Sequence, residues 1–338
     1  MTPQLITPPR MTQSILKGFN TVANHAYLMI FPFLLDLFLW MGPAISTKQT
    51  LNTFMQFLEK GMQEQIQQPE VMAQFQTLQP SLNEFIASFN LFGFLNTMPI
   101  GIPSLIAFQP IAENPMGLVQ RINTASILQE FFAFILILIV GSILGAVFFS
   151  EIGRNSNLKT PKQAFAPKTL LTHVLWLVLI NVGIWTLILM LLFPSMSIVV
   201  MLTMINSVLG NIANFVLLLL LFWIVIPLLF TPHAVVIQQM NPLKALLSSV
   251  RLIRFYLPGT GFFVLFSLLL YQGLNQFLWL QPVVTSYMLL GGIFGHAFIC
   301  TGLIASSFYY YQDGVTWMNH NLKMISQQSN QKDRPFQA

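Results

Sequence analysis

The sequence predicts an all-α fold, a polytopic integral membrane helical bundle with about six transmembrane helices, interfacial amphipathic helices and an outer helical loop. Of its 338 residues, 55% are hydrophobic and 7% are charged, and the mean hydropathy is +0.68. Soluble domains carry about 25% charged residues, so a water-soluble fold is excluded. Apolar runs of 18 or more residues indicate membrane-spanning helices, because a helix satisfies its own backbone hydrogen bonds in hydrocarbon. Six such runs lie near 26–45, 126–150, 169–193, 206–231, 259–280 and 283–311.

The distribution of basic residues predicts the orientation. If the six runs span the membrane, twelve of the fifteen Lys and Arg residues fall on one side: Arg10, Lys17, Arg154, Lys159, Lys162, Lys168, Lys244, Arg251, Arg254, Lys323, Lys332 and Arg334. By the positive-inside rule, both termini are then cytoplasmic and the protein lies in the cytoplasmic (plasma) membrane. The basic residues are spread over several loops instead of one face, so nucleic acid is not an expected partner.

The N-terminal half contains an interfacial helix, one span and the outer loop. Residues 1–25 form a cytoplasmic segment in which Ile15, Phe19 and Val22 recur at helical spacing, as in a helix lying in the headgroup layer. Residues 26–45 are the first span, and residues 46–125 form the extracytoplasmic loop.

The outer loop itself is predicted to be helical over most of its length. Two apolar stripes at helical spacing predict two amphipathic helices, interrupted at Pro69 and Pro80. Residues 92–110 are apolar but broken by glycines and prolines, which favours an interfacial or re-entrant cap over the bundle.

The C-terminal half, residues 126–311, holds the second to sixth spans and an interfacial elbow helix at 241–256. Asn241 suits the N-cap of this helix and Pro242 its first position. Its apolar face is predicted to hold Leu243, Leu246, Leu247, Val250 and Ile253. Lys244, Arg251 and Arg254 would bind the membrane surface, and residues 312–338 are predicted to form a solvated and partly disordered cytoplasmic tail.

Residues 227–263, "PLLFTPHAVVIQQMNPLKALLSSVRLIRFYLPGTGFF", resemble the membrane-domain family named after glycerophosphoryl diester phosphodiesterases and its uncharacterised multi-pass relatives. In that family a span with a Pro-containing exit is followed by a helix of the type P-x-x-A-L-x-x-S. Here the corresponding residues are Pro242, Ala245, Leu246 and Ser249, and the usual acidic linker residue is replaced by Gln238 and Gln239. The resemblance implies the architecture of span, elbow and span. It implies no enzymatic activity, because the family name comes from a separate catalytic barrel that this sequence does not encode.

Five polar residues within the apolar runs form the candidate intramembrane site. Asp36 lies about ten residues from either end of the first run, near the bilayer midplane, and His296 has a comparable depth in the sixth run. The pair could serve as a proton relay or ion site, or Asp36 could bond to a neighbouring helix near Pro32. The asparagines Asn181, Asn211 and Asn214 could line a polar cavity or form interhelical hydrogen bonds.

Two GxxxG pairs, Gly141 with Gly145 and Gly291 with Gly295, are typical of close helix packing, within the chain or against another subunit. The single cysteine, Cys300, excludes an intrachain disulfide, and five scattered histidines do not predict a metal centre. No cofactor is expected; a chlorophyll-type pigment on His296 and a bound lipid remain alternatives.

The functional expectation is a non-enzymatic scaffold, assembly or accessory subunit of a membrane complex. Its expected partners are the lipid bilayer and other membrane-protein subunits. Helix-packing glycines and lateral apolar surface support this interpretation. An enzyme is not expected, because paired carboxylates and a nucleophile with a base are not recognisable in the sequence. The alternative is a transporter or lipid-handling membrane protein with a midplane site at Asp36.

Overall fold

The computed structural model describes residues 7–65, 69–97, 99–109, 117, 120–124, 126–156, 167–279 and 286–332. Lys159, Lys162 and Arg334, which are part of the predicted charge pattern, lie outside the described residues. The part of the 92–110 cap at residues 98 and 110 also lies outside them.

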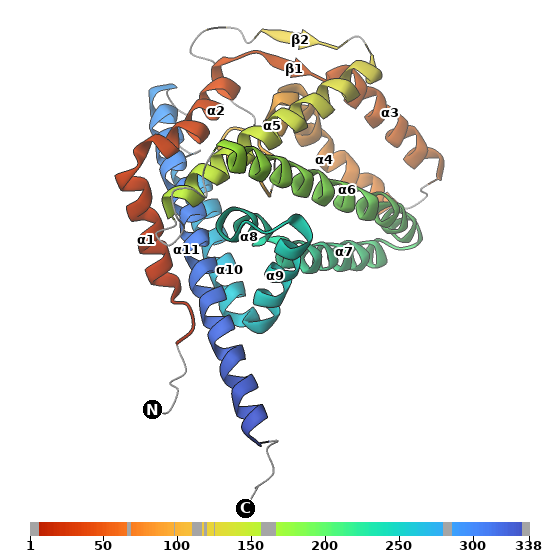
Figure 1. Ribbon diagram of the computed structural model, residues 1–338. Coiled ribbons are helices and arrows are strands. Elements are labelled where there is room, and N and C mark those ends of the chain that lie inside the picture. The colour runs from red at the N-terminus through yellow and green to blue at the C-terminus, as the bar shows by residue number, and fades with distance from the viewer. Residues whose placement is uncertain are drawn as a thin grey trace, which may run out of the picture.

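Eleven α-helices and one short pair of strands make up the described chain (Figure 1). The helices are α1 (Met11–Asn24), α2 (Ile30–Met41), α3 (Lys48–Gln65), α4 (Pro69–Ser88), α5 (Ile127–Ser156), α6 (Pro167–Ile205), α7 (Ser207–Leu228), α8 (Thr231–Gln238), α9 (Pro242–Phe255), α10 (Leu257–Leu274) and α11 (Ser286–Lys332). The strands β1 (Ala44–Ser46) and β2 (Arg121–Asn123) pair in parallel, with Ile45 opposite Ile122. The predicted all-α class is confirmed.

Five helical segments are long and apolar enough to cross a membrane. They are α5, most of α6, α7 together with α8, α10 with the turn that follows it, and the greater part of α11. These five coincide with the second to sixth predicted runs. The chain is therefore a multi-pass helical membrane protein, because hydrocarbon is the solvent that such surfaces require.

The first span predicted at 26–45 is shorter in the structure, where a continuous helix runs from Ala26 to Met41. Residues Ala26–Met29 form a 3-10 turn, and α2 has 12 residues, a length of about 18 Å against a hydrocarbon core of about 30 Å. Gly42 and Pro43 end the helix, and the chain continues into β1. A sixth span results only if α1 and residues 26–41, which are bent by 94°, cross together.

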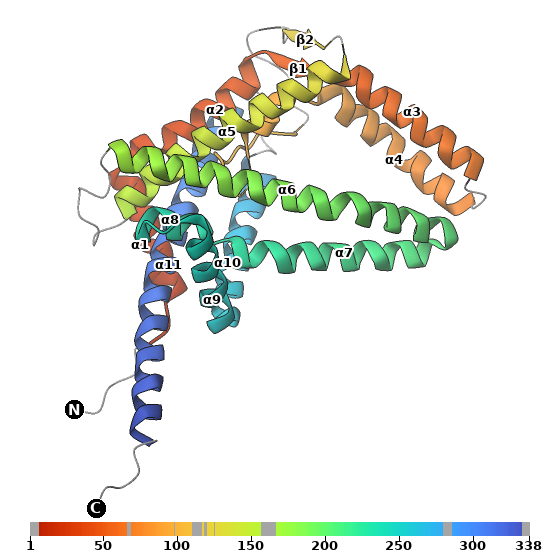
Figure 2. The same ribbon diagram turned by 45° about the vertical axis from the view of Figure 1, so that its right-hand side comes forward.

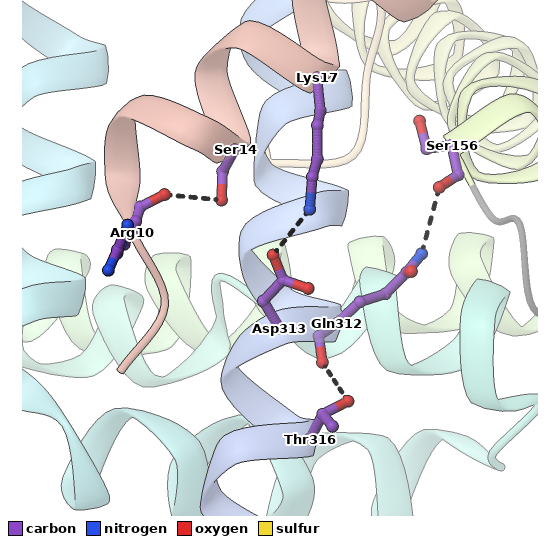
Figure 3. Close-up of polar contacts among 7 residues, drawn as sticks. All are labelled: Arg10, Ser14, Lys17, Ser156, Gln312, Asp313 and Thr316. Atoms are coloured by element: carbon purple, nitrogen blue, oxygen red, sulfur yellow. Dashed lines mark hydrogen bonds and ion pairs between the residues drawn. The ribbon is translucent and has the colours of Figure 1, made fainter. Parts of the chain in front are cut away.

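Helix α1 packs along α11, although its pattern predicted a helix lying in the headgroup layer. Gly18 lies directly against the main chain of Ser306, and the Phe19 and Phe298 rings are 5.4 Å apart. Figure 3 shows the polar contacts at this end of α11: Lys17 Nζ lies 3.2 Å from Asp313 Oδ2, and Gln312 Nε2 donates to the Ser156 carbonyl. Residues 312–332 of the predicted tail are therefore part of a helix that contacts both α1 and α5.

The outer loop contains two helices, as predicted, and they form a hairpin (Figure 2). Pro69 begins α4, which suits a residue without a backbone N–H. Pro80 lies inside α4, so the predicted interruption there is wrong. The hairpin α3–α4 lies on the opposite side of the molecule from the beginning of α1, the end of α11 and α9 (Figures 1 and 2).

The long helices lie in two crossing directions. In both views α11 runs close to the vertical, whereas α6 and α7 run across it and project from the body as a hairpin (Figures 1 and 2). The core forms where α5, α8 and α11 meet the segment after α4, which begins with the 3-10 turn Leu91–Leu95 and continues as irregular chain. This segment carries Ile100, Ile102, Leu105 and Ile106, all of them buried, so the predicted cap is inserted into the bundle.

Candidate functional site

Asp36 binds the main chain of the inserted segment. Its carboxylate is fully buried and accepts hydrogen bonds from Ser104 Oγ, from the Leu105 N–H at 3.0 Å and from the Ile106 N–H at 3.2 Å. Ser104 Oγ in turn accepts from the Ala107 N–H at 2.9 Å. One interpretation of the sequence was that Asp36 bonds to a neighbouring helix. In the structure its partner is instead a segment of irregular backbone.

The chemical role of this contact follows from the position of the segment. Residues 104–107 have no helical partners for their N–H groups, and an unpaired N–H at membrane depth costs several kcal/mol. A carboxylate offers up to four acceptor positions and no donor when ionised, which matches a partner set made only of donors. Asp36 thus caps a turn that hydrocarbon alone would not tolerate.

His296 does not pair with Asp36 in the structure. The imidazole is buried on α11, and its Nδ1 donates to Asn275 Oδ1 at 2.8 Å. Asn275 begins the π-helical turn Asn275–Trp279 that follows α10, and the Tyr271 ring lies 5.5 Å from the imidazole. Asp36 and His296 therefore have different hydrogen-bond partners, although both lie against the inserted segment, where the Pro103 carbonyl interacts with His296.

The three candidate asparagines have different surroundings. Asn181 Nδ2 donates to Ser142 Oγ at 2.8 Å, and this buried hydrogen bond joins α6 to α5. Asn211 and Asn214 are exposed on α7 and do not reach the other candidate residues. The structure thus confirms an interhelical hydrogen bond for Asn181, and it does not bring the three asparagines together around one polar cavity, which was the alternative interpretation.

The glycines also divide into two groups. A Cβ at Gly141 would stand 2.7 Å from the Leu95 carbonyl oxygen, and one at Gly145 would stand 2.7 Å from the Ile100 carbonyl oxygen. These two glycines therefore let α5 approach the inserted segment, although the motif predicted contact with a helix. Gly291 is exposed, with no atom within 4 Å of its Cβ position, and Gly295 is partly buried.

The elbow helix α9 has the predicted ends but a different buried face. Asn241 Oδ1 accepts from the Lys244 N–H at 2.9 Å, and Pro242 is the first helical residue. The side chains that face the protein are small or lie toward the C-terminal end of the helix: Ala245, Ser249, Leu252 and Ile253. Leu243 and Leu247 are 74% and 66% exposed, whereas Leu246 and Val250 are half-buried and Ile253 is buried, so only part of the predicted apolar face points outward.

Packing against the end of α7 explains this choice of face. Ser249 Oγ donates to the Pro227 carbonyl at 2.7 Å and accepts from the Phe230 N–H at 3.1 Å, which fixes α9 where α7 ends. Periodicity reveals an apolar stripe but cannot tell whether protein or lipid covers it. Lys244, Arg251 and Arg254 are exposed beside the outward leucines, an arrangement suited to a membrane surface.

A cavity of about 220 Å³, which the sequence did not predict, lies next to the inserted segment and α10. Its walls come from the inserted segment, α5, the α7–α8 junction, α10 and α11. His233 and Ser307 are among its lining residues, with His233 Nε2 2.7 Å from Ser307 Oγ. Ser307 Oγ also lies 2.7 Å from the Ile304 carbonyl, so its one hydroxyl hydrogen has two candidate acceptors, His233 Nε2 and that carbonyl.

Sequence patterns held no signal for several of these residues. Ser104, Tyr271 and Asn275 become site residues only because the inserted segment and the turn after α10 bring them beside Asp36 and His296. Among the described residues, no group of three or more His, Cys, Asp or Glu side chains is placed to hold a metal ion. Comparisons with protein-family models, curated proteins and solved structures find no match to this chain.

Proposed function

We propose that this protein is a non-enzymatic scaffold, assembly or accessory subunit of a complex in the cytoplasmic membrane, with both termini cytoplasmic. The α6–α7 hairpin would be its lateral contact surface. The observation that carries the proposal is the small extent to which this hairpin is covered. In an 18-residue apolar stretch of each segment, 17% of the residues are buried in α6 and 6% in α7 with α8, against 56% in α11.

Lipid alone could cover an apolar hairpin, but two polar side chains favour a protein partner. Asn211 and Asn214 are exposed on α7, about 6 and 10 Å along the helix from Ser207. Their neighbours Ile212 and Phe215 are also exposed. An amide facing hydrocarbon gains when it hydrogen-bonds to another transmembrane helix, so this part of α7 suits a contact between subunits.

Purification from the native membrane in mild detergent tests the proposal. We expect the wild-type chain to migrate within a larger complex at constant stoichiometry. The double substitution Asn211→Leu and Asn214→Leu should release it from that complex while it remains folded. Ile212→Leu, between the two asparagines on the same helix, is the matched control and should keep the complex. A wild-type chain that elutes alone, in lipid nanodiscs as well as in detergent, would contradict the proposal.

The second candidate is a transporter or lipid-handling protein, and the cavity of about 220 Å³ favours lipid handling. Transport through Asp36 would require its contacts with Ser104 and the adjacent N–H groups to break. Asp36→Asn distinguishes the two functions. The accessory role expects this variant to remain in the complex and to retain its cellular function, whereas transport through Asp36 expects loss of function with the complex intact.

A further inference from the structure

We propose that the cavity between α10 and α11 binds one hydrocarbon chain of an anionic membrane lipid, which enters from the side of the protein. This inference is independent of the complex proposed above. It rests on how α10 is attached to the core, on what lines the cavity and on what surrounds its opening.

Helix α10 is held at two places and bounds the cavity between them. Near its beginning, the Phe263 ring stacks on Tyr310 with centroids 4.3 Å apart and an interplanar angle of 9°. Beyond its end, Asn275 accepts from His296. The residues between these two attachments that line the cavity, Val264, Ser267, Leu268 and Tyr271, share one face of the helix.

The opposite walls of the cavity are largely apolar, with Phe149, Leu229, Leu303 and Ile304 among the lining residues. At about 220 Å³ the cavity is larger than the apolar cavities of about 150 Å³ that bind benzene. It is smaller than the roughly 300–1,000 Å³ of sites for whole drug-sized ligands. These dimensions suit one chain and exclude a headgroup from the interior.

Two polar atoms among the lining residues are not paired by the described part of the protein itself. Ser267 Oγ and Asn96 Oδ1 are buried and have no hydrogen-bond partner in the described chain. In a lipid environment such atoms are costly to leave unpaired. A water molecule in the cavity could pair with both atoms, because it donates and accepts.

Access from the bilayer is short, because α10 is the outer wall. Phe262, Leu265 and Leu269 on its other face are strongly exposed, as expected of side chains that contact lipid. Residues 264–271 lie about 10–21 Å along the helix from Leu257. One leaflet contributes about 15 Å of the hydrocarbon core, so a chain anchored near the beginning of α10 can reach this depth.

The charges of α9 select the kind of lipid. This helix immediately precedes α10 and exposes Lys244, Arg251 and Arg254. Basic residues at a membrane surface attract anionic headgroups by about 1 kcal/mol each. We therefore expect the occupant to be an anionic phospholipid whose headgroup lies near α9.

Photo-crosslinking of the full chain in nanodiscs tests the site. The probe is a phosphatidylglycerol with a diazirine in one acyl chain, and the cross-linked residues are mapped by mass spectrometry. We expect cross-links at the cavity-lining residues of α10 and α11, with weaker labelling when phosphatidylcholine carries the same diazirine. Ser267→Phe and, separately, Val264→Phe should fill the cavity and remove these cross-links.

Leu269→Phe adds a similar ring on the lipid-facing side of α10 and is the matched control, which should keep the cross-links. Unchanged thermal unfolding of the variants shows that loss of labelling does not reflect unfolding. Equal labelling of the wild type, Ser267→Phe and Val264→Phe would mean annular lipid only, and the proposal would then be abandoned. Equal labelling by the anionic and the zwitterionic probe would overturn the assignment of an anionic lipid.

Discussion

Asp36 and Gly145 are single residues whose effect is to let irregular backbone lie inside a helical membrane protein. Asp36 supplies acceptors for Ser104 and for the N–H groups of residues 105 and 106. Gly145 supplies space for the carbonyl of Ile100. The sequence identified both residues as unusual, because a buried carboxyl and a GxxxG pair stand out in apolar runs. The sequence did not identify the inserted segment as the common partner of Asp36 and Gly145, because that segment shows no helical or strand periodicity.

Removal of the Asp36 carboxylate should destabilise the protein strongly. Asp36→Ala leaves three buried donors without their acceptor, and each unpaired donor costs about 1–3 kcal/mol. We expect a marked fall in the midpoint of thermal unfolding in detergent, with a smaller fall for Asp36→Asn, which keeps one acceptor oxygen. Asp313→Ala removes an exposed carboxylate paired with Lys17 and should cost about 0–1 kcal/mol. Equal midpoints for Asp36→Ala and Asp313→Ala would refute the capping role.

At the scale of elements, the five long apolar helices were predictable and the contacts between them were not. Hydropathy located α5, α6, α7, α10 and α11, because length and apolarity are properties of a single segment. The break between α1 and α2 and the orientation of α9 depend on neighbours that pack against these helices. Leu243 and Leu247 illustrate the difference, since the stripe they belong to was visible in the sequence but these two side chains face away from the protein.

The two glycine pairs give a matched test of element packing. Gly145→Ala places a methyl group against the Ile100 carbonyl and the Gly101 backbone of the inserted segment, whereas Gly291→Ala meets open space. We expect Gly145→Ala to lower the free energy of unfolding by about 1–3 kcal/mol, as for other overpacked sites. Gly291→Ala should leave it unchanged. Thermal unfolding of the purified variants provides the measurement, and a stable Gly145→Ala variant would show that α5 and the segment can separate without cost.

At the scale of the whole molecule, the arrangement agrees in part with the predicted topology. The beginning of α1, the end of α11 and α9 lie on the side opposite the α3–α4 hairpin (Figures 1 and 2). The basic residues of α9 therefore lie far from the hairpin that was predicted to be extracytoplasmic. Which side faces the cytoplasm stays a prediction from the positive-inside rule.

Cysteine labelling can test this topology, because the native Cys300 is buried. Single cysteines are introduced at the exposed positions Thr53, Arg154 and Ser326 and treated with a membrane-impermeant maleimide. We expect Thr53→Cys to react in intact cells, and Arg154→Cys and Ser326→Cys to react only after the membrane is opened. Reaction of Arg154→Cys and Ser326→Cys from opposite sides would contradict the predicted arrangement of spans.

The sequence by itself determined that hydrocarbon is the main solvent of this protein, where its long helices lie and where α9 begins. These properties depend on composition, on segment length and on local capping residues such as Asn241. The tertiary structure alone decided that residues after α4 enter the bundle, that Asp36 and His296 bind different partners and that a cavity separates α10 from α11. The reason is that these features arise between segments far apart in the chain, where side-chain volume and unpaired backbone groups, and not periodicity, decide what fits.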